Sequence, residues 1–529
     1  MSLATDTPVS TRSRSGSTST SGCSYETATV VVSQSRNDSM YKIPPLDDLT
    51  ADERTPLLVG GDRVMRGRGW TYSLLLKEAW VLVRYALPVA CTMLLEYSFL
   101  ATPVVAIGHL STEMLAGAAL GETTAGVTGF SILQGFVSAL DSVLPQAWTS
   151  DNPSHVGLWA QRMSVMVAFL TIPIINIWMN AECMFLYLRQ DPTVAQYAAL
   201  YLKYLTITLP SYSFNRIIRR YFQAQGLMGV PSFITAIVTP INIAITYALV
   251  WGPECVRLGF IGAPIASSIS MTFMSCLYIA YGIFFVPRTA WHPISSRAFT
   301  DMPKIFRLGL SGVGQTAAEW WSWEFISLAA SQLGPTTLAS QSVLVVSASS
   351  AYMVHAGLGL ASAVRIGNLL GAGDAYGALI ASKAALVLAL IQSLILASVF
   401  MSMHSQLAYF FNSDQGVAKL VSGVVPLLAI YQVVDGIAGT ASGILRACGK
   451  ISTSASANFV GYYILGIPLG VFLAFMHRLG LFGLWIGLTT ALFFVVAILY
   501  AAIVRLDWDV EVREAKERVE TRPSNVEYA

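Results

Sequence analysis

The chain has 529 residues, of which 54% are hydrophobic and only 12% are charged. Such a chain has too little polar surface to cover a water-soluble globule of this size, so a soluble protein is excluded. The net charge is only +2, and the basic residues divide among many segments, which excludes a nucleic-acid-binding patch.

The first 76 residues are predicted to form a disordered cytosolic tail. Residues 1–50 are rich in Ser and Thr, as in "STRSRSGSTSTSG", and cannot bury enough apolar surface to fold. They contain no apolar core, so a cleavable signal peptide is not expected. In "DERTPLL", Glu53 precedes Leu57 and Leu58 with the spacing of an acidic dileucine sorting signal. This pattern predicts adaptor binding and a vacuolar or endosomal membrane. A chance match to so short a pattern, with a plasma-membrane location, is the alternative.

Twelve apolar stretches follow, each near the roughly 20 residues that cross a bilayer. They span residues 79–101, 114–140, 160–181, 196–222, 231–251, 260–286, 305–330, 337–361, 378–402, 417–443, 453–475 and 480–504. An even number of spans places both termini on one side of the membrane. Seventeen Lys and Arg flank the spans on that side and five on the other. Because positively charged loops stay inside, both termini are predicted to be cytosolic.

The two halves of the chain repeat each other. "RYALP" at 84 matches "RLGLS" at 307, "LAG" at 115 matches "LAS" at 338, and "FQAQG" at 222 matches "LRACG" at 445. Each pair is 223 residues apart (307 − 84, 338 − 115 and 445 − 222). Two halves of this kind, related by an axis along the membrane normal, frame a central path that opens alternately to each side. The repeat therefore predicts a transporter.

The predicted fold is an all-α polytopic membrane protein with twelve transmembrane helices in two pseudo-symmetric six-helix bundles. The N-terminal lobe spans residues 77–287 and the C-terminal lobe residues 305–505. A polar, basic cytosolic linker, residues 288–304, connects the lobes. Residues 506–529 are charged and are predicted to form a solvated cytosolic helix or tail.

Several motifs resemble those of the multidrug and toxic compound extrusion (MATE) transporter family. They are "LDSVLPQAWTSDNPSHVGLWAQR" at 140, "YMVHAGLGLASAVRIGNLLGAGD" at 352 and "VDGIAGTASGILRACGK" at 434. "EWWSWE" at 319 resembles the eukaryotic branch, whose acids at these positions belong to the cation and proton path. The resemblance also implies a role for Asp435, which matches a family acid. His355 departs from the pattern, because it replaces the usual helix-bending proline.

The seventh span carries two acids and three tryptophans. At 100° per residue, Trp323, Trp320 and Glu324 lie at about 40°, 100° and 140° from Glu319, so the four share one arc. Carboxylates and indole faces suit an organic cation, and carboxyls away from water can exchange protons near neutral pH. Glu96 is the repeat partner of Glu319 (319 − 96 = 223).

These residues predict a site that binds cations or protons at Glu319, Glu324, Asp435 and Glu96, with Trp320 and Trp323 as cavity aromatics. Competition between protons and substrate for the same carboxylates would produce antiport. Glu96 and Glu122 have an alternative role as hydrogen-bond partners of neighbouring helices. His355 is a candidate proton relay or a packed, neutral histidine, and Asp141 is expected to orient the following loop.

Arg216, Arg219 and Arg220 are interpreted as cytosolic anchors, with lipid contacts as the alternative. The expected coupling ion is a proton, with sodium as the alternative, and no other cofactor or metal is expected. A flippase for a lipid-linked substrate is the rival transporter, but its cavity should be basic. An enzyme is not expected, because the six histidines form no HxxxH or HExxH motif. The expected partners are membrane lipid and organic cations, and a monomer is expected. A disulfide between Cys183 and Cys255 stays open.

Overall fold

The computed structural model describes residues 68–108, 110–407 and 414–519, and these belong to one structural unit, Arg54–Ala529. All regular structure in the described residues is helical, which confirms the predicted class. The dileucine residues Glu53, Leu57 and Leu58 lie outside the described residues. The rest of the predicted N-terminal tail up to residue 67, and residues 520–529, also lie outside them.

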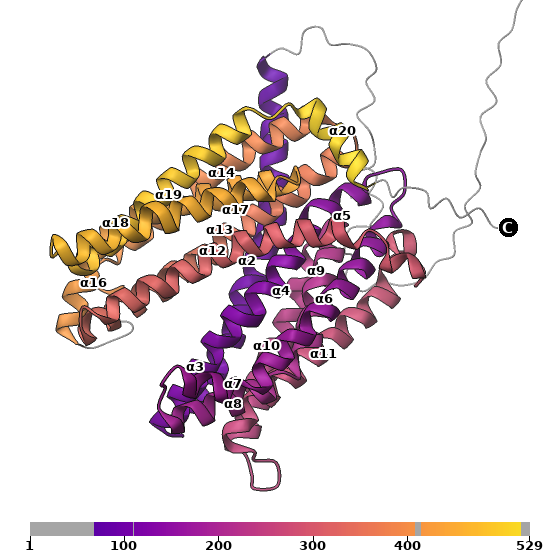
Figure 1. The fold of residues 1–529 in the computed structure, drawn as a ribbon. Helices are drawn as coiled ribbons and strands as arrows, with labels where there is room; N and C mark the ends of the chain where they lie inside the picture. Colours follow the sequence, from indigo (N-terminus) through magenta and orange to yellow (C-terminus); the bar gives the residue numbers. More distant parts are fainter. Residues whose placement is uncertain (1–67, 109, 408–413, 520–529) are drawn as a thin grey trace, which may run out of the picture. The chain divides into compact units, whose positions relative to one another are not determined.

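Two sets of helices correspond to the two halves of the chain (Figure 1). The first set is α2 (Arg68–Gly108), α3 (Thr112–Ala125), α4 (Ser131–Ser138), α5 (Leu140–Trp148), α6 (His155–Met179), α7 (Ala181–Tyr187), α8 (Pro192–Leu205), α9 (Thr208–Ala224), α10 (Gly229–Trp251) and α11 (Gly262–Phe285). The second set is α12 (Met302–Ser331), α13 (Pro335–Gly371), α14 (Ala375–Ser402), α16 (Gln415–Ala447), α17 (Ile451–Phe459), α18 (Ile467–Val471), α19 (Gly480–Val504) and α20 (Trp508–Val519).

Ten helical segments among the described residues are long and apolar enough to cross a membrane. The two other predicted spans are also helical, as α8 with α9 and as α12. These two carry charges within the span, three arginines on α9 and two glutamates on α12. All twelve predicted passes are therefore helical, and the two most polar of them contribute to the cavity described below.

The halves contact each other through two equivalent helix pairs, α2 with α13 and α4 with α12. Glycines allow the second pair to approach closely: a Cβ on Gly312 would lie 2.1 Å from the carbonyl oxygen of Gly135. Small residues of this kind are common where membrane helices pack without a hydrophobic driving force between them. At one end of the helices the two halves separate, with α3, α7 and α8 on one side and α16 and α18 on the other (Figure 1).

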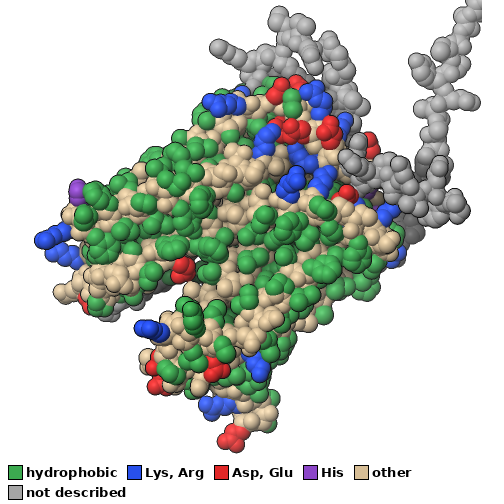
Figure 2. Space-filling view, viewed as in Figure 1, with side chains coloured by type: hydrophobic (Ala, Val, Ile, Leu, Met, Phe, Trp, Pro, Cys, Tyr) green, Lys and Arg blue, Asp and Glu red, His purple; other side chains and the backbone are tan. Residues whose placement is uncertain are grey.

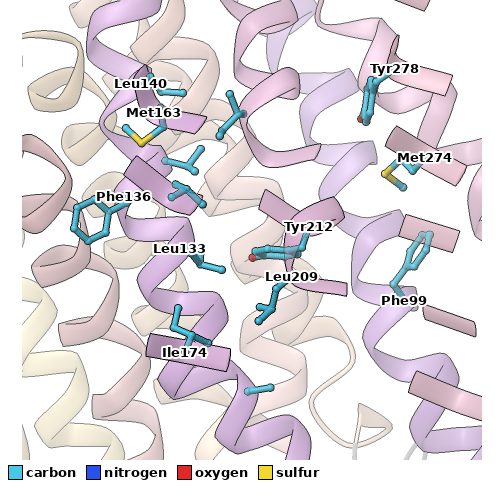
Figure 3. Packing of buried hydrophobic residues seen from close by; sticks show 14 of the residues in the cluster. Phe99, Leu133, Phe136, Leu140, Met163, Ile174, Leu209, Tyr212, Met274 and Tyr278 are labelled. Carbon is cyan, nitrogen blue, oxygen red and sulfur yellow. The ribbon is translucent and has the colours of Figure 1, made fainter. Parts of the chain in front are cut away.

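Large apolar side chains fill the space between the helices of the N-terminal half. Leu133 and Phe136 of α4, Leu209 of α9 and Met274 of α11 are all buried in one cluster (Figure 3). Hydrophobic side chains also cover the outer surface of the helices, whereas charged side chains gather toward their ends (Figure 2). A surface of this kind is expected where lipid contacts the protein.

The C-terminal helix α20 is not the solvated segment that its charges predicted. It packs against α5, α13 and α14, and it buries Glu511, Ala515 and Val519. Lys450 forms an ion pair with Glu511. The sequence does not reveal that α20 is amphipathic, because one of its three buried residues is a glutamate. The burial of this glutamate depends on its basic partner. We call this end of the helices the α20 end and the opposite end the open end.

Arg518 of α20 connects both halves at the α20 end. Its Nη1 donates to Oε1 of Gln146 on α5 at 3.1 Å, and Nζ of Lys304 on α12 donates to its carbonyl oxygen at 2.5 Å. Gln146 in turn donates to the carbonyl of Ala447 at the end of α16 at 2.7 Å. These contacts hold the halves together at the α20 end.

Candidate functional site

A cavity of about 650 Å³ lies between the two halves and is lined by residues of both. The molecule is hollowed between the separated ends of the halves (Figure 2). The charged lining residues are Glu96, Glu122, Asp141, Glu319, Glu324 and Asp435, together with Arg216, Arg220 and Arg446. The cavity is therefore not simply acidic, although the sequence predicted only acids as charged residues of the site. The interpretation of Arg216, Arg219 and Arg220 as cytosolic anchors was wrong. They lie on a face of α9 that points inward, and hydropathy does not reveal this.

Glu319 of α12 and Asp435 of α16 form what we call the acidic pair. They lie close enough to interact electrostatically, and Tyr352 lies beside Glu319. Asp435 is 5% exposed. Arg446 attracts Glu319 from a greater distance. Among the described residues, however, neither carboxylate has an ion-pair partner within 4 Å. The two carboxylates thus remain available to a cation or a proton.

Tyrosines surround the acidic pair. Tyr352 and Tyr462 line the cavity, and the buried Tyr431 lies near Tyr462. Sequence reasoning missed these residues, because a tyrosine within an apolar span carries no signal that distinguishes cavity from core. Their hydroxyls can donate to a carboxylate and their rings can contact an organic cation.

The predicted arc on α12 is only partly present. Glu319, Trp320 and Glu324 line the cavity, and Trp320 and Glu324 are exposed there. Trp323 does not line it, since its ring packs edge to face against Tyr431 at 5.6 Å and Trp485 at 5.7 Å. The prediction of Trp323 as a cavity aromatic was wrong. A helical wheel gives the direction of a side chain, but not which neighbouring helix lies there.

Glu96 lines the cavity in a different environment from its repeat partner Glu319. Arg216 pairs with its Oε2 at 3.1 Å, and Arg219 forms a second, shorter ion pair with the same carboxylate. The three arginines of α9, at spacings of three and four residues, share one helical face. Glu96 therefore carries a charge that is already balanced, and its role as a cation site stays a prediction.

Asp141 lies at the α20 end of the cavity and joins the two halves. Its carboxylate pairs with Nε of Arg220 at 2.7 Å and with Nη1 of Arg446, from the other half, at 3.6 Å. The expectation that Asp141 orients the following loop missed these partners, which lie 79 and 305 residues away in the chain (220 − 141 and 446 − 141). Arg446 is one of the seventeen Lys and Arg predicted to flank the spans on the cytosolic side, because it follows the predicted span 417–443.

The remaining predicted residues have local partners. Glu122 lines the cavity and accepts a 2.5 Å hydrogen bond from the Tyr201 hydroxyl, as in the helix-pairing alternative. His355 is 1% exposed, is not among the cavity residues, and has Nδ1 3.1 Å from Gln392 Nε2. These contacts fit the packed-histidine alternative. Cys183 and Cys255 are free thiols in the structure.

No group of three or more His, Cys, Asp or Glu able to hold a metal ion occurs in the part of the chain that the structure describes. The acidic pair provides two carboxylates for one monovalent cation or one proton. The arrangement can thus bind and release a cation. The charged groups that line the cavity include no nucleophile paired with a general base.

Comparisons with known proteins agree with this geometry. The family profile MatE matches twice, over residues 88–248 and 313–472, which are the two halves of the repeat. An uncharacterized transporter of Schizosaccharomyces pombe is 36% identical over 433 residues, covering 82% of this chain and 80% of that protein. Multidrug and toxin extrusion protein 2 of Mus musculus is 32% identical over 485 residues, covering 90% and 84%.

Solved structures share the fold. The crystal structure of the eukaryotic MATE transporter AtDTX14 superposes with a TM-score of 0.79 at 28% identity, covering 84% of this chain and all of that one. The Vibrio cholerae MATE transporter VcmN in the bent form gives a TM-score of 0.74 at 16% identity, covering 85% of this chain and all of that one, which shows a common fold. The chain is therefore a multi-pass membrane transporter, not an enzyme, and it belongs to the multidrug and toxic compound extrusion (MATE) family.

Proposed function

We propose that this protein exports organic cations in exchange for protons by alternating access, with the α20 end in the cytosol. The observation that carries the proposal is the acidic pair, two carboxylates in a cavity between two lobes with no ion-pair partner among the described residues. Relatives named multidrug and toxin extrusion proteins support the substrate class. The excess of Lys and Arg in the flanks on the α20 side supports the orientation.

A cation entering from the cytosol would contact Glu319 and Asp435, with the Trp320 indole providing apolar area and a cation–π contact of roughly 0.5–2 kcal/mol. When the cavity faces the acidic compartment, protons neutralise the carboxylates and the substrate leaves. The conformation described here opens away from α20. A return to the cytosol-facing conformation has to break the pair between Asp141 and Arg446 and the contacts of Arg518.

The test is uptake of labelled tetraethylammonium into proteoliposomes with an acidic interior. We expect concentrative uptake by the wild type and a loss of at least about tenfold in Glu319→Gln, because an amide cannot carry the exchanged proton. Glu324→Gln should lose less, since this residue is exposed at the cavity wall. Glu182→Gln, an exposed glutamate of α7, is the matched control. Uptake that is independent of the pH gradient would refute proton coupling.

Sodium coupling is the second candidate, because the same two carboxylates could bind Na⁺. An outward-directed sodium gradient at equal pH on both sides distinguishes the two ions. If this gradient drives uptake and the pH gradient does not, the coupling ion is sodium and the cation site stays at the same residues.

A further inference from the structure

The last helix of the described chain, α20, lies across the boundary between the two halves. Near its start, Glu511 is 2% exposed and forms an ion pair with Lys450, which lies between α16 and α17 of the C-terminal half. Ala515 is buried in a cluster formed mainly by helices of the same half. One helical turn later, Val519 is buried in a cluster whose other members are mainly residues of the N-terminal half. The first turns of α20 thus contact one half and its last turn contacts the other.

Arg518, beside Val519, is held by segments of both halves. Its Nη1 donates to Oε1 of Gln146 on α5 at 3.1 Å, and its carbonyl oxygen accepts from Nζ of Lys304 on α12 at 2.5 Å. The guanidinium also lies over Gly449, where an added Cβ would be 2.8 Å from Cζ of Arg518. Gly449 has a φ of +71°, so both the backbone and the space at this position favour glycine. We call Arg518 and Val519 the α20 tip.

The α20 tip adjoins the place where α5 of the N-terminal half meets α13 of the C-terminal half. Gln146, the partner of Arg518, lies so close to α13 that a Cβ on Gly371 would overlap its carbonyl oxygen. Oγ1 of Thr149 donates to the carbonyl oxygen of Asn368 at 2.7 Å. This contact between the halves closes the cavity at the α20 end. In alternating access by two lobes that rock against each other, it has to open.

The attachments of α20 to the two halves differ in kind. The C-terminal half provides the buried ion pair of Glu511 and the packing against α13 and α14. The N-terminal half provides the hydrogen bond of Arg518 and the burial of Val519. The Arg518 side chain is 14% exposed, so water can replace Gln146 as its partner. Breaking a buried ion pair costs more than exchanging a hydrogen bond with water. When the halves separate, α20 should therefore stay on the C-terminal half and release only its tip.

We propose that the α20 tip is a latch, which holds the cavity closed at the α20 end and has to leave α5 before the cavity can open there. By stabilising the closed arrangement, the latch sets how often the cavity opens toward the α20 side. In the proposed orientation this is the step in which the cytosolic substrate enters. The inference rests on the alternating access of the proposed function and adds a device that controls it.

Labelling of one cavity cysteine from the two sides of the membrane tests the proposal. Ser442 lines the cavity and is 6% exposed. Ser442→Cys, in a variant without other cysteines, would be labelled by a charged, membrane-impermeant methanethiosulfonate in right-side-out and inside-out vesicles. We expect Arg518→Ala to speed labelling from the α20 side about fivefold, the size of one net hydrogen bond. Labelling from the open side should become slower, because both rates depend on the same conformational equilibrium.

Two further variants frame this result. Arg513→Ala changes an exposed arginine of the same helix and should leave both labelling rates unchanged. A chain that ends before Asp507 lacks α20 altogether and should be labelled from the α20 side even faster than Arg518→Ala. The point variant keeps the proposal testable if the shortened chain does not fold.

The outcomes separate the latch from the proposed exchange of cations and protons. Unchanged rates in Arg518→Ala would overturn the latch. Faster labelling from both sides would also overturn it, because the substitution would then loosen the fold without shifting the equilibrium. Labelling needs neither substrate nor a pH gradient. If the two rates shift in opposite directions but tetraethylammonium is not taken up, the proposed exchange fails and the latch stands.

Discussion

Glu96 and Glu319 occupy equivalent positions in the two halves, but their surroundings differ. Glu96 is held by Arg216 and Arg219, whereas Glu319 faces Tyr352 and Asp435 without an ion pair among the described residues. The same backbone position thus holds a balanced charge in one half and an available carboxylate in the other. The two halves therefore share the arrangement of their helices but differ in the side chains that surround this glutamate.

The divergence originates in one pair of equivalent helices, α9 and α16. Shifted by 223 residues, Arg216, Arg219 and Arg220 correspond to Gly439, Ser442 and Gly443, which are small and uncharged. In the opposite sense, Tyr212 of α9 corresponds to Asp435 of α16. At these positions, three arginines and a tyrosine in one half are thus replaced by two glycines, a serine and an aspartate in the other. The two halves therefore contribute different charged groups to the cavity although the fold is nearly symmetric.

Breaking the ion pairs of Glu96 should have the largest effect on stability. Glu96→Gln leaves Arg216 and Arg219 without their shared carboxylate, and the Arg219 side chain is only 3% exposed. Loss of one member of a buried pair costs about 3–5 kcal/mol, which thermal unfolding in detergent would detect. Adding Arg219→Leu should recover most of this loss, because it removes the buried unpaired guanidinium. If the double variant is no more stable than Glu96→Gln, the pair does not contribute in this way.

The acidic pair should respond in the opposite direction. Glu319→Gln removes a carboxyl that has no ion-pair partner among the described residues, so we expect the free energy of unfolding to rise by about 1–2 kcal/mol while transport is lost. The same unfolding measurement checks this, with Glu182→Gln as the control. A clear loss of stability in Glu319→Gln would show that its charge is balanced within the fold, as that of Glu96 is.

The aromatic side of the acidic pair can be tested with two neighbouring tryptophans. Trp320 and Trp321 are 40% and 39% exposed, but only Trp320 lines the main cavity. Trp320→Ala should raise the KM for tetraethylammonium about fivefold, equivalent to roughly 1 kcal/mol of cation–π interaction. Trp321→Ala should leave it unchanged. Equal effects from both would place the substrate elsewhere.

The smallest effect is expected at the α20 end. Cys448 is 1% exposed, and burial together with nearby Glu511 raises the pKa of its thiol to about 12, so maleimide labelling at pH 8 should be slow. Arg518→Ala removes contacts of α20 and should speed labelling a few-fold in a variant whose only cysteine is Cys448, because the reagent gains access to the thiol. This gain has to exceed the loss of the Arg518 charge, which lowers the pKa of the thiol. Arg513→Ala, exposed on the same helix, is the control. Unchanged labelling would mean that Arg518 does not hold α20 in place.

The sequence by itself determined the membrane location, the twelve helices, the repeat and the family. Each of these depends on local hydropathy or on motifs that lie within one or two spans. The same analysis identified Glu319, Glu324 and Asp435, because carboxylates stand out in an apolar helix.

Only the tertiary structure decided what surrounds these carboxylates. The pairing of Glu96 with arginines 120 and 123 residues away, the packing of Trp323 into the core and the docking of α20 all depend on which helices become neighbours. Helical periodicity gives the direction of each side chain, but its partner is set by helix packing over long sequence separations. For this reason charges read as loop anchors proved to line a cavity.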